Sequence, residues 1–543
     1  MDQGSLLLLL GVLTISFYYL LYIPLIRLCG SIVGSSLRKK TASRRATLLQ
    51  DVESTGKAYE ARRAISVRDR WSHVASKSKF KVNVKPADKK KENYDGIIGF
   101  LHPFCNAGGG GERVLWAAVR ATQSKYPNAL CVVYTGDHDV NKDQILMRVK
   151  ERFAIDLYPP TITFLYLKTR HYVLASTWPR FTLIGQSLGS LVMAWDAFNL
   201  LVPDIFIDTM GYAFTLALSR FLFPEIPTGA YVHYPTISTD MLASLGFQDG
   251  GRRGLNAGSG RGIRGSLKKQ YWHMFAYLYS WVGGSVDVVT TNSSWTQNHI
   301  QQLWGKARQR RSKAFPVSVV YPPVAVSEIE IDIPINHESE KDRKATLLYI
   351  AQFRPEKNHS LVMQSFAKFL QDRKTDAAAE QPTLLLVGSV RDATDEKYIY
   401  SLRLLAHELH ITSSVKFMLN AKWDEIRAAL AESTVGINAM WNEHFGIGVV
   451  EYQAAGLISV VNDSGGPKLD IVVDMDGEPT GFHASTAEEY AAGYGKALDL
   501  GLEEKVAMRL RARKSSKRFS EDVFDDQWIV HMEKLVSLTA DPK

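Results

Sequence analysis

The chain has 543 residues, of which 45% are hydrophobic and 22% charged, a composition typical of a globular protein with room for two domains and not of a disordered chain. Three scattered cysteines exclude a disulfide framework and a cysteine-based metal site, and they fit a reducing compartment. The net charge of +9 comes from residues 27–91, where eighteen Lys and Arg stand against five Asp and Glu, so a uniformly basic nucleic-acid groove is excluded.

The first predicted element is an uncharged apolar segment over residues 6–26, long enough as a helix to cross a hydrocarbon core of about 30 Å. A cleaved signal peptide is the alternative, but no basic region precedes the segment and no small-residue cleavage site stands out. Lysines and arginines follow the segment, whereas only Asp2 precedes it. The positive-inside rule therefore predicts a transmembrane anchor over 1–30, a basic juxtamembrane linker over 31–93 that contacts membrane lipids, and a cytosolic body.

Strands and helices alternate over residues 94–330, which predicts a first Rossmann-like domain on a mostly parallel sheet. Buried strands are expected at DGIIGFLHPF, ALCVVYTGD, FTLIGQSLG, DIFIDT and TGAYVHYP. Residues 246–266 are rich in glycine and arginine, so they are expected to form a flexible surface loop. An RNA-binding segment of the RGG type is the alternative, but the repeats and aromatic residues of such segments are missing.

A second alternating series follows the polar linker INHESEKDRKA and predicts a second Rossmann-like domain over residues 344–515. The segment FDDQWIVHMEKLVSL predicts an amphipathic C-terminal helix within residues 516–543. Two such α/β domains that face each other form a cleft, and open α/β sheets bind ligands at the carboxyl ends of their strands.

The most informative stretch is MWNEHFGIGVVEYQAAGLISVVNDSGGPKLD in the second domain. Glu443 falls in the loop before a helix, and Glu451 falls inside that helix. Between them, Phe445, Gly446 and Ile447 offer backbone amides at a helix N-terminus, an arrangement suited to a diphosphate. A pair of exposed carboxylates on a capped helix is the plainer interpretation, but glycines stand where a close ligand needs them.

Two cations, Arg354 and Lys357 in AQFRPEKNHS, follow a predicted strand and precede a predicted helix. In that position they can reach the cleft and neutralise a diphosphate without a metal. Solvated loop charges are the alternative. The sequence therefore predicts no metal site and no cofactor.

These motifs resemble the retaining GT-B glycosyltransferases of the glycogen-synthase and phosphatidylinositol-mannosyltransferase group, over almost all of the two domains. The resemblance implies that Glu451 contacts the ribose of the donor, Glu443 its sugar, and an Arg/Lys pair its diphosphate. Lys357 matches the family's lysine in its Pro-Glu-Lys context. The usual arginine would fall at Gln352, whereas this chain has Arg354 two places further along the strand, which keeps the same face.

The first domain carries the same resemblance. A glycine run matches the family's loop that admits the diphosphate and the acceptor: Gly108, Gly109, Gly110 and Gly111. His233, in YVHYP, matches the histidine that lines the sugar site, although a lone histidine is more often structural.

A narrower resemblance is to the α1,2-mannosyltransferases of the dolichol pathway, through HPFCNAGGGGERVLW, DTMGYAF, HYPTISTDML, AQFRPEKNH and NEHFGIGVVEYQAAG. It implies that the substrate GDP-mannose donates the fourth and fifth mannoses in turn to a dolichyl-diphosphate-linked oligosaccharide for protein N-glycosylation. It also implies the endoplasmic reticulum membrane, with a lumenal N-terminus, a cytosolic catalytic body, and other mannosyltransferases of the pathway as partners. Another donor or lipid acceptor stays open.

Three competing interpretations remain. The run GQSLG fits the nucleophile elbow of α/β-hydrolases, with Ser187, Asp208 and His233 in hydrolase order, but this interpretation leaves the motif of the second domain unexplained. Asp137 begins a DHD run that imitates a metal-binding motif of other glycosyltransferases, and a surface turn is expected there. An inactive, nucleotide-binding membrane scaffold is the third.

Overall fold

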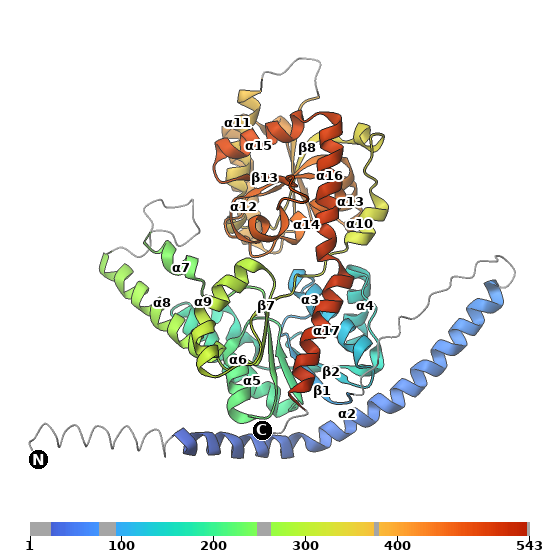
Figure 1. The fold of residues 1–543 in the computed structure, drawn as a ribbon, viewed down its shortest axis with the longest axis vertical. Helices are drawn as coiled ribbons and strands as arrows, with labels where there is room; N and C mark the ends of the chain where they lie inside the picture. The colour runs from blue at the N-terminus through green and yellow to red at the C-terminus, as the bar shows by residue number, and fades with distance from the viewer. Residues whose placement is uncertain (1–22, 75–93, 247–261, 374–379, 540–543) are drawn as a thin grey trace, which may run out of the picture.

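The computed structural model describes residues 23–74, 94–246, 262–373 and 380–539. These residues form two α/β domains stacked along the long axis of the molecule, with a long helix beneath the first domain (Figure 1). Every strand pair inside the two sheets is parallel. The predicted pair of Rossmann-like α/β domains is therefore confirmed, whereas the N-terminal transmembrane helix that was expected with them stays a prediction.

The first domain is built on a seven-stranded sheet with the order β3-β2-β1-β4-β5-β6-β7. Its strands are β1 (Ile97–Leu101), β2 (Leu130–Thr135), β3 (Ile162–Tyr166), β4 (Ile205–Asp208), β5 (Thr228–Val232), β6 (Val288–Thr291) and β7 (Ser318–Val319). Apolar side chains on both faces of the central strands are buried by helices, as is usual for parallel sheets.

The helices that cover this sheet are α3 (Gly110–Lys125), α4 (Lys142–Phe153), α5 (Thr182–Leu200), α6 (Ala213–Leu222), α7 (Thr239–Ser244), α8 (Gly262–Gly283) and α9 (Ser294–Arg310). Local sequence starts several of them. Asp208, at the end of β4, accepts hydrogen bonds from the backbone amides that lead into α6, and Ser293 caps α9 by accepting from the amide of Thr296.

The second domain has a six-stranded sheet with the order β10-β9-β8-β11-β12-β13. Its strands are β8 (Lys344–Ile350), β9 (Thr383–Gly388), β10 (Val415–Leu419), β11 (Ser433–Asn438), β12 (Ile458–Asn462) and β13 (Gly481–Ala484). Its helices are α10 (Val326–Asp332), α11 (His359–Asp372), α12 (Ala393–Glu408), α13 (Trp423–Glu432), α14 (Ile447–Ala455), α15 (Ala487–Asp499) and α16 (Leu502–Ser516). The second sheet thus begins where the sequence places the end of the polar linker.

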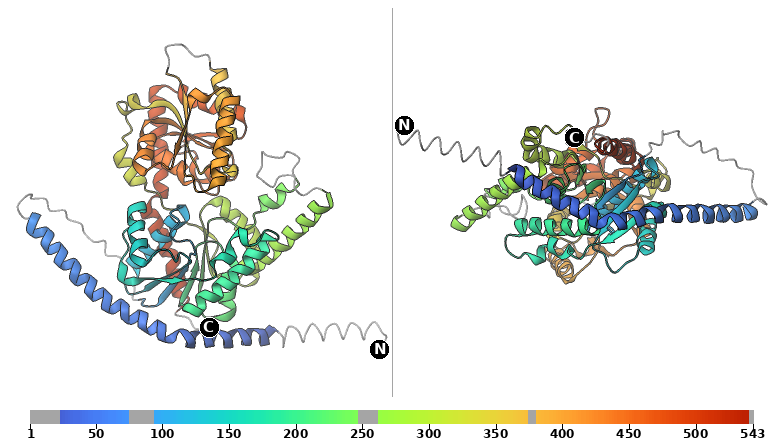
Figure 2. Two further views of the ribbon diagram at one scale, coloured as in Figure 1. Left: turned by 180° about the vertical axis from the view of Figure 1, so that it is seen from behind. Right: turned by 90° about the horizontal axis from the view of Figure 1, so that it is seen from below.

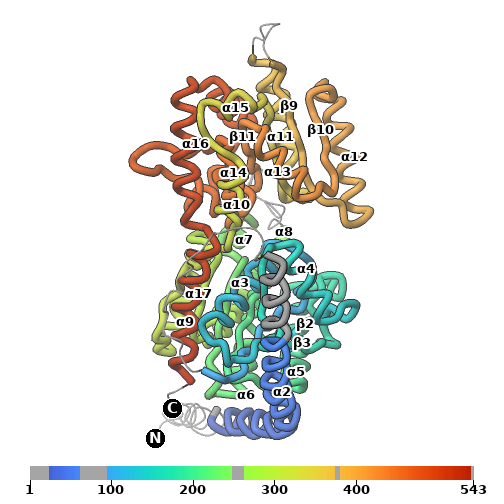
Figure 3. The backbone as a smooth tube through the Cα atoms, turned by 90° about the vertical axis from the view of Figure 1, so that its right-hand side faces the viewer, coloured from blue at the N-terminus to red at the C-terminus, as the bar shows by residue number. Residues whose placement is uncertain are grey.

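The C-terminal helix α17 (Glu521–Ser537) crosses back from the second domain and lies on the first (Figure 3). The Glu521 carboxylate pairs with Arg113 at 2.6 Å and with Arg120 at 2.7 Å, both on α3. Trp528 is buried and donates a hydrogen bond of 3.0 Å to Thr122. The end of the chain therefore ties the two domains together.

The segment expected to be a basic linker is largely a helix. Helix α2 (Ile23–Val74) runs beneath the first domain (Figures 1 and 2), and Gly30 and Gly34 bring it against the backbone at the end of α6. Arg45 pairs with Asp204 at 2.7 Å. A linker was the wrong expectation for these residues because basic side chains on one face of a helix can pair with acidic and carbonyl oxygens of a folded domain.

The predicted anchor over residues 1–30 lies mostly outside the described residues, which begin at residue 23. None of the helices within the described ranges combines the length and the apolar character needed to cross a membrane. Most of the predicted loop 246–266 also lies outside them, and its last residues, from Gly262, begin α8.

One predicted strand is wrong. The segment FTLIGQSLG belongs to helix α5, and Ser187 is buried on that helix instead of lying at a strand-to-helix elbow. Asp137 is likewise no surface turn residue, because it is buried, pairs with Arg170, and accepts a hydrogen bond of 2.9 Å from the amide of Asn106. The hydrolase and DHD interpretations both lose their geometric basis.

Candidate functional site

The glycine run of the first domain faces the start of α14 in the second. A β-carbon at Gly110 would lie 2.6 Å from the Cδ1 atom of Ile447, and one at Gly111 would lie 3.7 Å from Nε2 of His233. The absence of a side chain at Gly110 therefore lets Ile447 of the second domain come close to the glycine run. The structure brings these residues together although they come from distant parts of the chain.

The start of α14 has no side-chain cap among the described residues, and Gly446 adopts the left-handed conformation there, with φ of +107°. The amides of Val449 and Val450 donate to the carbonyl of Gly446, whereas the amides that precede them have no acceptor one turn earlier in the helix. Phe445 turns its ring into the core, where it stacks on Tyr321 with a centroid distance of 5.8 Å. The buried ring thus anchors the backbone at the start of the helix.

The SGGP segment holds this loop in place. The amide of Gly466 donates to the carbonyl of Glu443 at 2.8 Å, and the amide of Asn442 donates to the hydroxyl of Ser464 at 2.8 Å. A β-carbon at Gly466 would lie 2.6 Å from Cα of Phe445, which leaves no room for a side chain. These glycines position the loop and do not themselves face a ligand.

Lys357 and Glu443 form an ion pair of 2.5 Å beside the start of α14. Burial alone would raise the pKa of Glu443, but the charge of Lys357, with a smaller contribution from His444, brings that pKa below its usual value. Glu443 is therefore ionised at neutral pH, and its carboxylate holds the amine of Lys357 beside the loop that leads into α14.

Arg354 is less closely integrated. It precedes the short turn Pro355–Lys357, and its guanidinium lies 3.8 Å from the carboxylate of Glu356. In the described part of the chain its ion-pair partner is thus Glu356 and not the Glu443 carboxylate. The arginine stands at the same edge of the second sheet as Lys357, but the structure does not join it to the pair.

Glu451 lies one turn inside α14. Burial raises its pKa to about 7, although the positive charge of Arg113 acts in the opposite direction. Arg113 belongs to α3 of the first domain and also pairs with Glu521 of α17. An arginine of the first domain therefore lies near a carboxyl group of the second.

His233 follows β5 and belongs to a buried polar cluster of the first domain. Burial, with a smaller contribution from the neighbouring His102, lowers its pKa to about 4, so the imidazole is neutral at physiological pH. Its Nε2 atom has no hydrogen-bond partner among the described residues. That nitrogen faces the space beside Gly111 and can accept or donate a hydrogen bond there.

Glu112 and His102 complete this cluster, and sequence reasoning missed both. The Glu112 carboxylate accepts a hydrogen bond of 2.6 Å from the amide of Gly109 and lies 3.8 Å from His102. Its pKa is below the usual value because the contact with His102 outweighs burial, which acts in the opposite direction. A glutamate three residues after a helix cap was the available signal.

The contacts that join the domains beside this site were also missed. Asn442 donates a hydrogen bond of 2.6 Å to Asp240 of α7. The ring of His444 packs against Tyr234 in a tilted arrangement with a centroid distance of 4.1 Å, and it stacks on Trp295 at 5.3 Å. Most of these residues belong to the segments that resemble the dolichol-pathway mannosyltransferases, but no local sequence pattern predicts that they form a contact between the domains.

Comparisons with known proteins agree with this architecture. Residues 95–304 match the family described as ALG11 mannosyltransferase N-terminus, and residues 332–517 match the family described as glycosyl transferases group 1. A protein of Neurospora crassa named GDP-Man:Man(3)GlcNAc(2)-PP-Dol alpha-1,2-mannosyltransferase is 57% identical over 98% of this chain and 97% of its own length. Proteins of the same name from Mus musculus and Homo sapiens are 43% and 44% identical and cover 86% and 81% of this chain, over 92% and 87% of their own lengths.

Solved structures share the fold. The Anabaena protein Alr3699/HepE, in complex with UDP and glucose, has a TM-score of 0.53 and 15% identity over 80% of this chain and 99% of its own. The N-terminal domain of a trehalose-6-phosphate phosphatase from Candida albicans has a TM-score of 0.59 and 12% identity over 85% of this chain and 99% of its own.

Proposed function

Because this chain belongs to the family of the GDP-Man:Man(3)GlcNAc(2)-PP-Dol alpha-1,2-mannosyltransferases, we propose that it transfers mannose from GDP-mannose to a dolichyl-diphosphate-linked oligosaccharide. The new linkage is α1,2 with retention, and two mannoses, the fourth and the fifth, are added in turn. The observation that carries this proposal is the Lys357–Glu443 pair at the uncapped start of α14, opposite the glycine run.

The donor diphosphate binds at the amides of Phe445, Gly446 and Ile447, where the helix dipole favours negative charge. Lys357 then exchanges part of its contact with Glu443 for the phosphate oxygens, and the half-buried Arg354 turns towards the diphosphate as the second cation. The freed Glu443 carboxylate accepts hydrogen bonds from the sugar hydroxyls. Glu451 accepts them from the ribose.

The reaction proceeds on one face of the sugar. The bond between the anomeric carbon and the phosphate oxygen breaks, the acceptor oxygen bonds to the same carbon, and the acceptor proton passes to the departing phosphate. A double displacement would need two carboxyl groups about 5 Å apart across the sugar, and the sequence suggests no such pair. The cations and the start of α14 stabilise the leaving GDP, and neutral His233 lines the sugar.

We place the enzyme in the endoplasmic reticulum membrane, with a single N-terminal span, a lumenal N-terminus and the catalytic body in the cytosol, where it serves protein N-glycosylation. The uncharged residues 6–22 and the basic side chains of α2 support this placement. We further propose that the protein contacts membrane lipids and neighbouring mannosyltransferases of the pathway. Since two cations and a helix dipole meet the diphosphate charge, catalysis needs no metal, and activity should survive EDTA.

Purified full-length chain in detergent, supplied with the Man(3)GlcNAc(2) dolichyl-diphosphate acceptor and a panel of nucleotide sugars, tests the proposal. Mass spectrometry should show one and then two added hexoses with GDP-mannose alone, and an α1,2-specific mannosidase should remove both. Transfer from another donor, or a product resistant to that mannosidase, would contradict it. No release of GDP would favour the inactive scaffold.

A further inference from the structure

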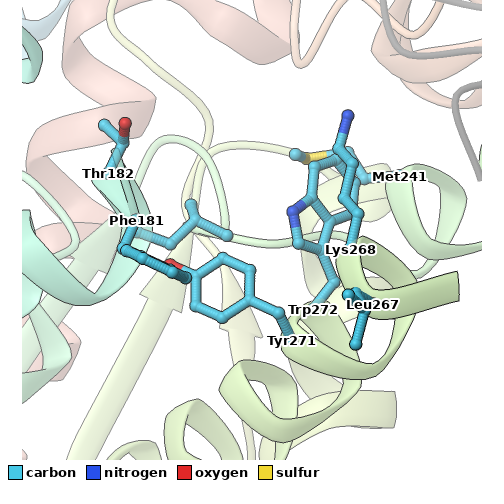
Figure 4. Close-up of a pocket in the computed structure, with 8 residues that line it drawn as sticks. Phe181, Thr182, Met241, Leu267, Lys268, Tyr271 and Trp272 are labelled. Carbon is cyan, nitrogen blue, oxygen red and sulfur yellow. The ribbon is translucent and has the colours of Figure 1, made fainter. Parts of the chain in front are cut away.

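An open apolar pocket lies on the first domain between the start of α5 and helix α8 (Figure 4). Its volume is about 490 Å³, within the range of pockets that bind small ligands. Phe181 and Leu183 line it from α5, Met241 from α7, and Leu267 and Tyr271 from α8. The site described above does not use this pocket.

The outer edge of the pocket continues into a stripe of exposed apolar side chains along α8. The stripe comprises Ile263, Leu267, Met274, Tyr277 and Trp281, which are 84%, 61%, 49%, 72% and 58% exposed. Their spacing of three to seven residues places them on one face of the helix. A soluble surface seldom carries so continuous an apolar face, and aromatic residues beside cations are typical of contact with a membrane interface.

This stripe ends beside the start of α2. The guanidinium of Arg311 lies 5.2 Å from the ring centroid of Trp281. Burial lowers the pKa of Arg311, and the positive charge of Arg27, near the start of α2, lowers it as well, so the two arginines lie close together. The views in Figures 1 and 2 agree that the end of α8 and the start of α2 are neighbours. The uncharged residues 6–22 join α2 at this same end.

The inner edge of the pocket adjoins the donor loop. The hydroxyl of Tyr234 lies 2.7 Å from the sulfur of Met241, and the ring of Tyr234 packs against His444. Asp240, the neighbour of Met241, accepts the hydrogen bond from Asn442. One layer of side chains thus separates the pocket from the loop that carries Glu443.

We propose that this pocket and the stripe on α8 hold the isoprenoid chain of the lipid-linked acceptor. The inference rests on the proposed function, because such an acceptor must extend from a bilayer to the site of sugar transfer. The surface has the matching form, with an apolar path that starts at Trp281, near the start of α2, and stops beside the donor loop. Lys268, whose amine lies 5.0 Å from the ring centroid of Trp272, adds a cation at the rim for the acceptor diphosphate.

The test compares two acceptors that carry the same oligosaccharide diphosphate, one on dolichol and one on a short water-soluble alkyl chain. The variants are Leu267→Asp, at an exposed position, and Phe181→Asn, because asparagine tolerates the left-handed conformation found at this residue, with φ of +53°. Ile331→Asp, 82% exposed on α10, is the matched control. In detergent, the two pocket variants should raise the KM for the dolichyl acceptor about tenfold and leave the short acceptor unchanged.

The short acceptor separates the two claims. If the unsubstituted protein transfers mannose to neither acceptor, the proposed function fails. If it uses both, and the pocket variants change KM for neither, the assignment of the pocket is overturned while the function stands. Equal losses of activity with both acceptors would also overturn the assignment, because the substitutions would then not act through binding of the isoprenoid chain.

A second measurement identifies the occupant directly. A dolichyl acceptor with a photoreactive group in its first isoprene units should label peptides that line the pocket, from residues 181–183, 239–244 or 262–272, and unlabelled acceptor should suppress the labelling. Labelling outside these segments would refute the proposal. Two other results would also refute it. If the variants float less with acceptor-free vesicles while their KM is unchanged, the surface binds the bilayer and not the acceptor. If light scattering shows that the variants form a smaller particle than the unsubstituted protein, the surface binds a second copy of the chain.

Discussion

The pair formed by Lys357 and Glu443 places a cation and a carboxylate beside the start of a helix that no side chain caps in the described part of the chain. Without a ligand the two charges satisfy each other inside the protein. A diphosphate would draw the lysine towards itself because it carries more charge than the carboxylate. One residue can therefore hold the loop in the empty state and stabilise the leaving group during transfer.

Lys357→Ala should lower kcat by about 10²- to 10³-fold, since removing a donor that stabilises developing charge costs roughly 3 to 4 kcal/mol of barrier. Single-turnover transfer from GDP-mannose measures the effect. Lys368→Ala on α11, where the lysine pairs with Asp372 at 3.0 Å on the surface, is the matched control and should be silent. Full activity of Lys357→Ala, with its unfolding curve unchanged, would remove this lysine from the mechanism.

The binding of GDP-mannose should depend on pH through Glu451, whose pKa burial raises to about 7. Ribose hydroxyls that donate to the carboxylate favour its ionised form, so binding releases a proton. Affinity should fall about tenfold as the pH drops from 8 to 6. His233 and His444, both with a pKa of about 4, stay neutral over this range, and Glu451→Gln should abolish the dependence in calorimetry.

The stability of the protein without GDP-mannose should depend on pH in the opposite direction through Glu451, because it should decrease as the pH rises. The raised pKa of Glu451 means that its contribution to stability is complete below the unfolded value of 4.5 and is lost as the pH rises through about 7. Glu451→Gln should therefore stabilise the unliganded protein at pH 8 and have little effect at pH 4. A stability change at pH 8 that matches the change at pH 4 would show that burial does not disfavour the ionised carboxylate.

At the scale of elements, helix α2 meets the end of α6 through two glycines one helical turn apart. A β-carbon at Gly34 would lie 2.0 Å from the carbonyl oxygen of Leu222, and one at Gly30 would lie 2.7 Å from that of Phe221. Backbone atoms cannot yield as a flexible side chain can. The glycines therefore determine how closely α2 lies against the first domain.

Gly34→Leu should destabilise the protein by about 2 kcal/mol, because the new side chain forces α2 away from α6. Gly56→Leu on the same helix is the control, since the nearest atoms to a β-carbon there are 3.9 Å away. Thermal unfolding and limited proteolysis within α2 measure the difference. Equal behaviour of the two variants would mean that the close contact contributes nothing to stability.

At the scale of the whole molecule, the proposed membrane anchor would confine the enzyme to the surface where a lipid-linked acceptor diffuses, which would raise the encounter frequency much as a linker raises effective concentration. Deleting residues 1–22 should reduce transfer to dolichyl acceptor in vesicles at least tenfold and leave a soluble acceptor unaffected. An unrelated apolar span fused to Ile23 should restore the vesicle activity. Equal losses with both acceptors would instead indicate damage to the folded body.

Helix α5 shows why part of the fold could not be predicted from local patterns. Its segment FTLIGQSLG is apolar and too short for periodicity to separate helix from strand. Gly185 and Gly189 suggest turns, but they serve close packing instead: a β-carbon at Gly189 would lie 2.1 Å from the carbonyl oxygen of Tyr172, and one at Gly185 would lie 2.4 Å from the ring of Trp178. A glycine that allows close packing of a helix cannot be distinguished in the sequence from a glycine that allows a turn, because the difference lies in the residues that surround it in space.

The sequence by itself determined the parallel α/β architecture and the donor motif, because buried strands, helix starts and the glycines that they need are local properties of the chain. The tertiary structure alone decided that Lys357 pairs with Glu443, that Gly110 faces Ile447, and that Arg113 of the first domain lies near the Glu451 carboxyl group. These contacts depend on how two separate sheets face each other. That orientation follows from the contacts of α17 and of the loop before α14, which join residues hundreds of positions apart and leave no periodic trace in the sequence.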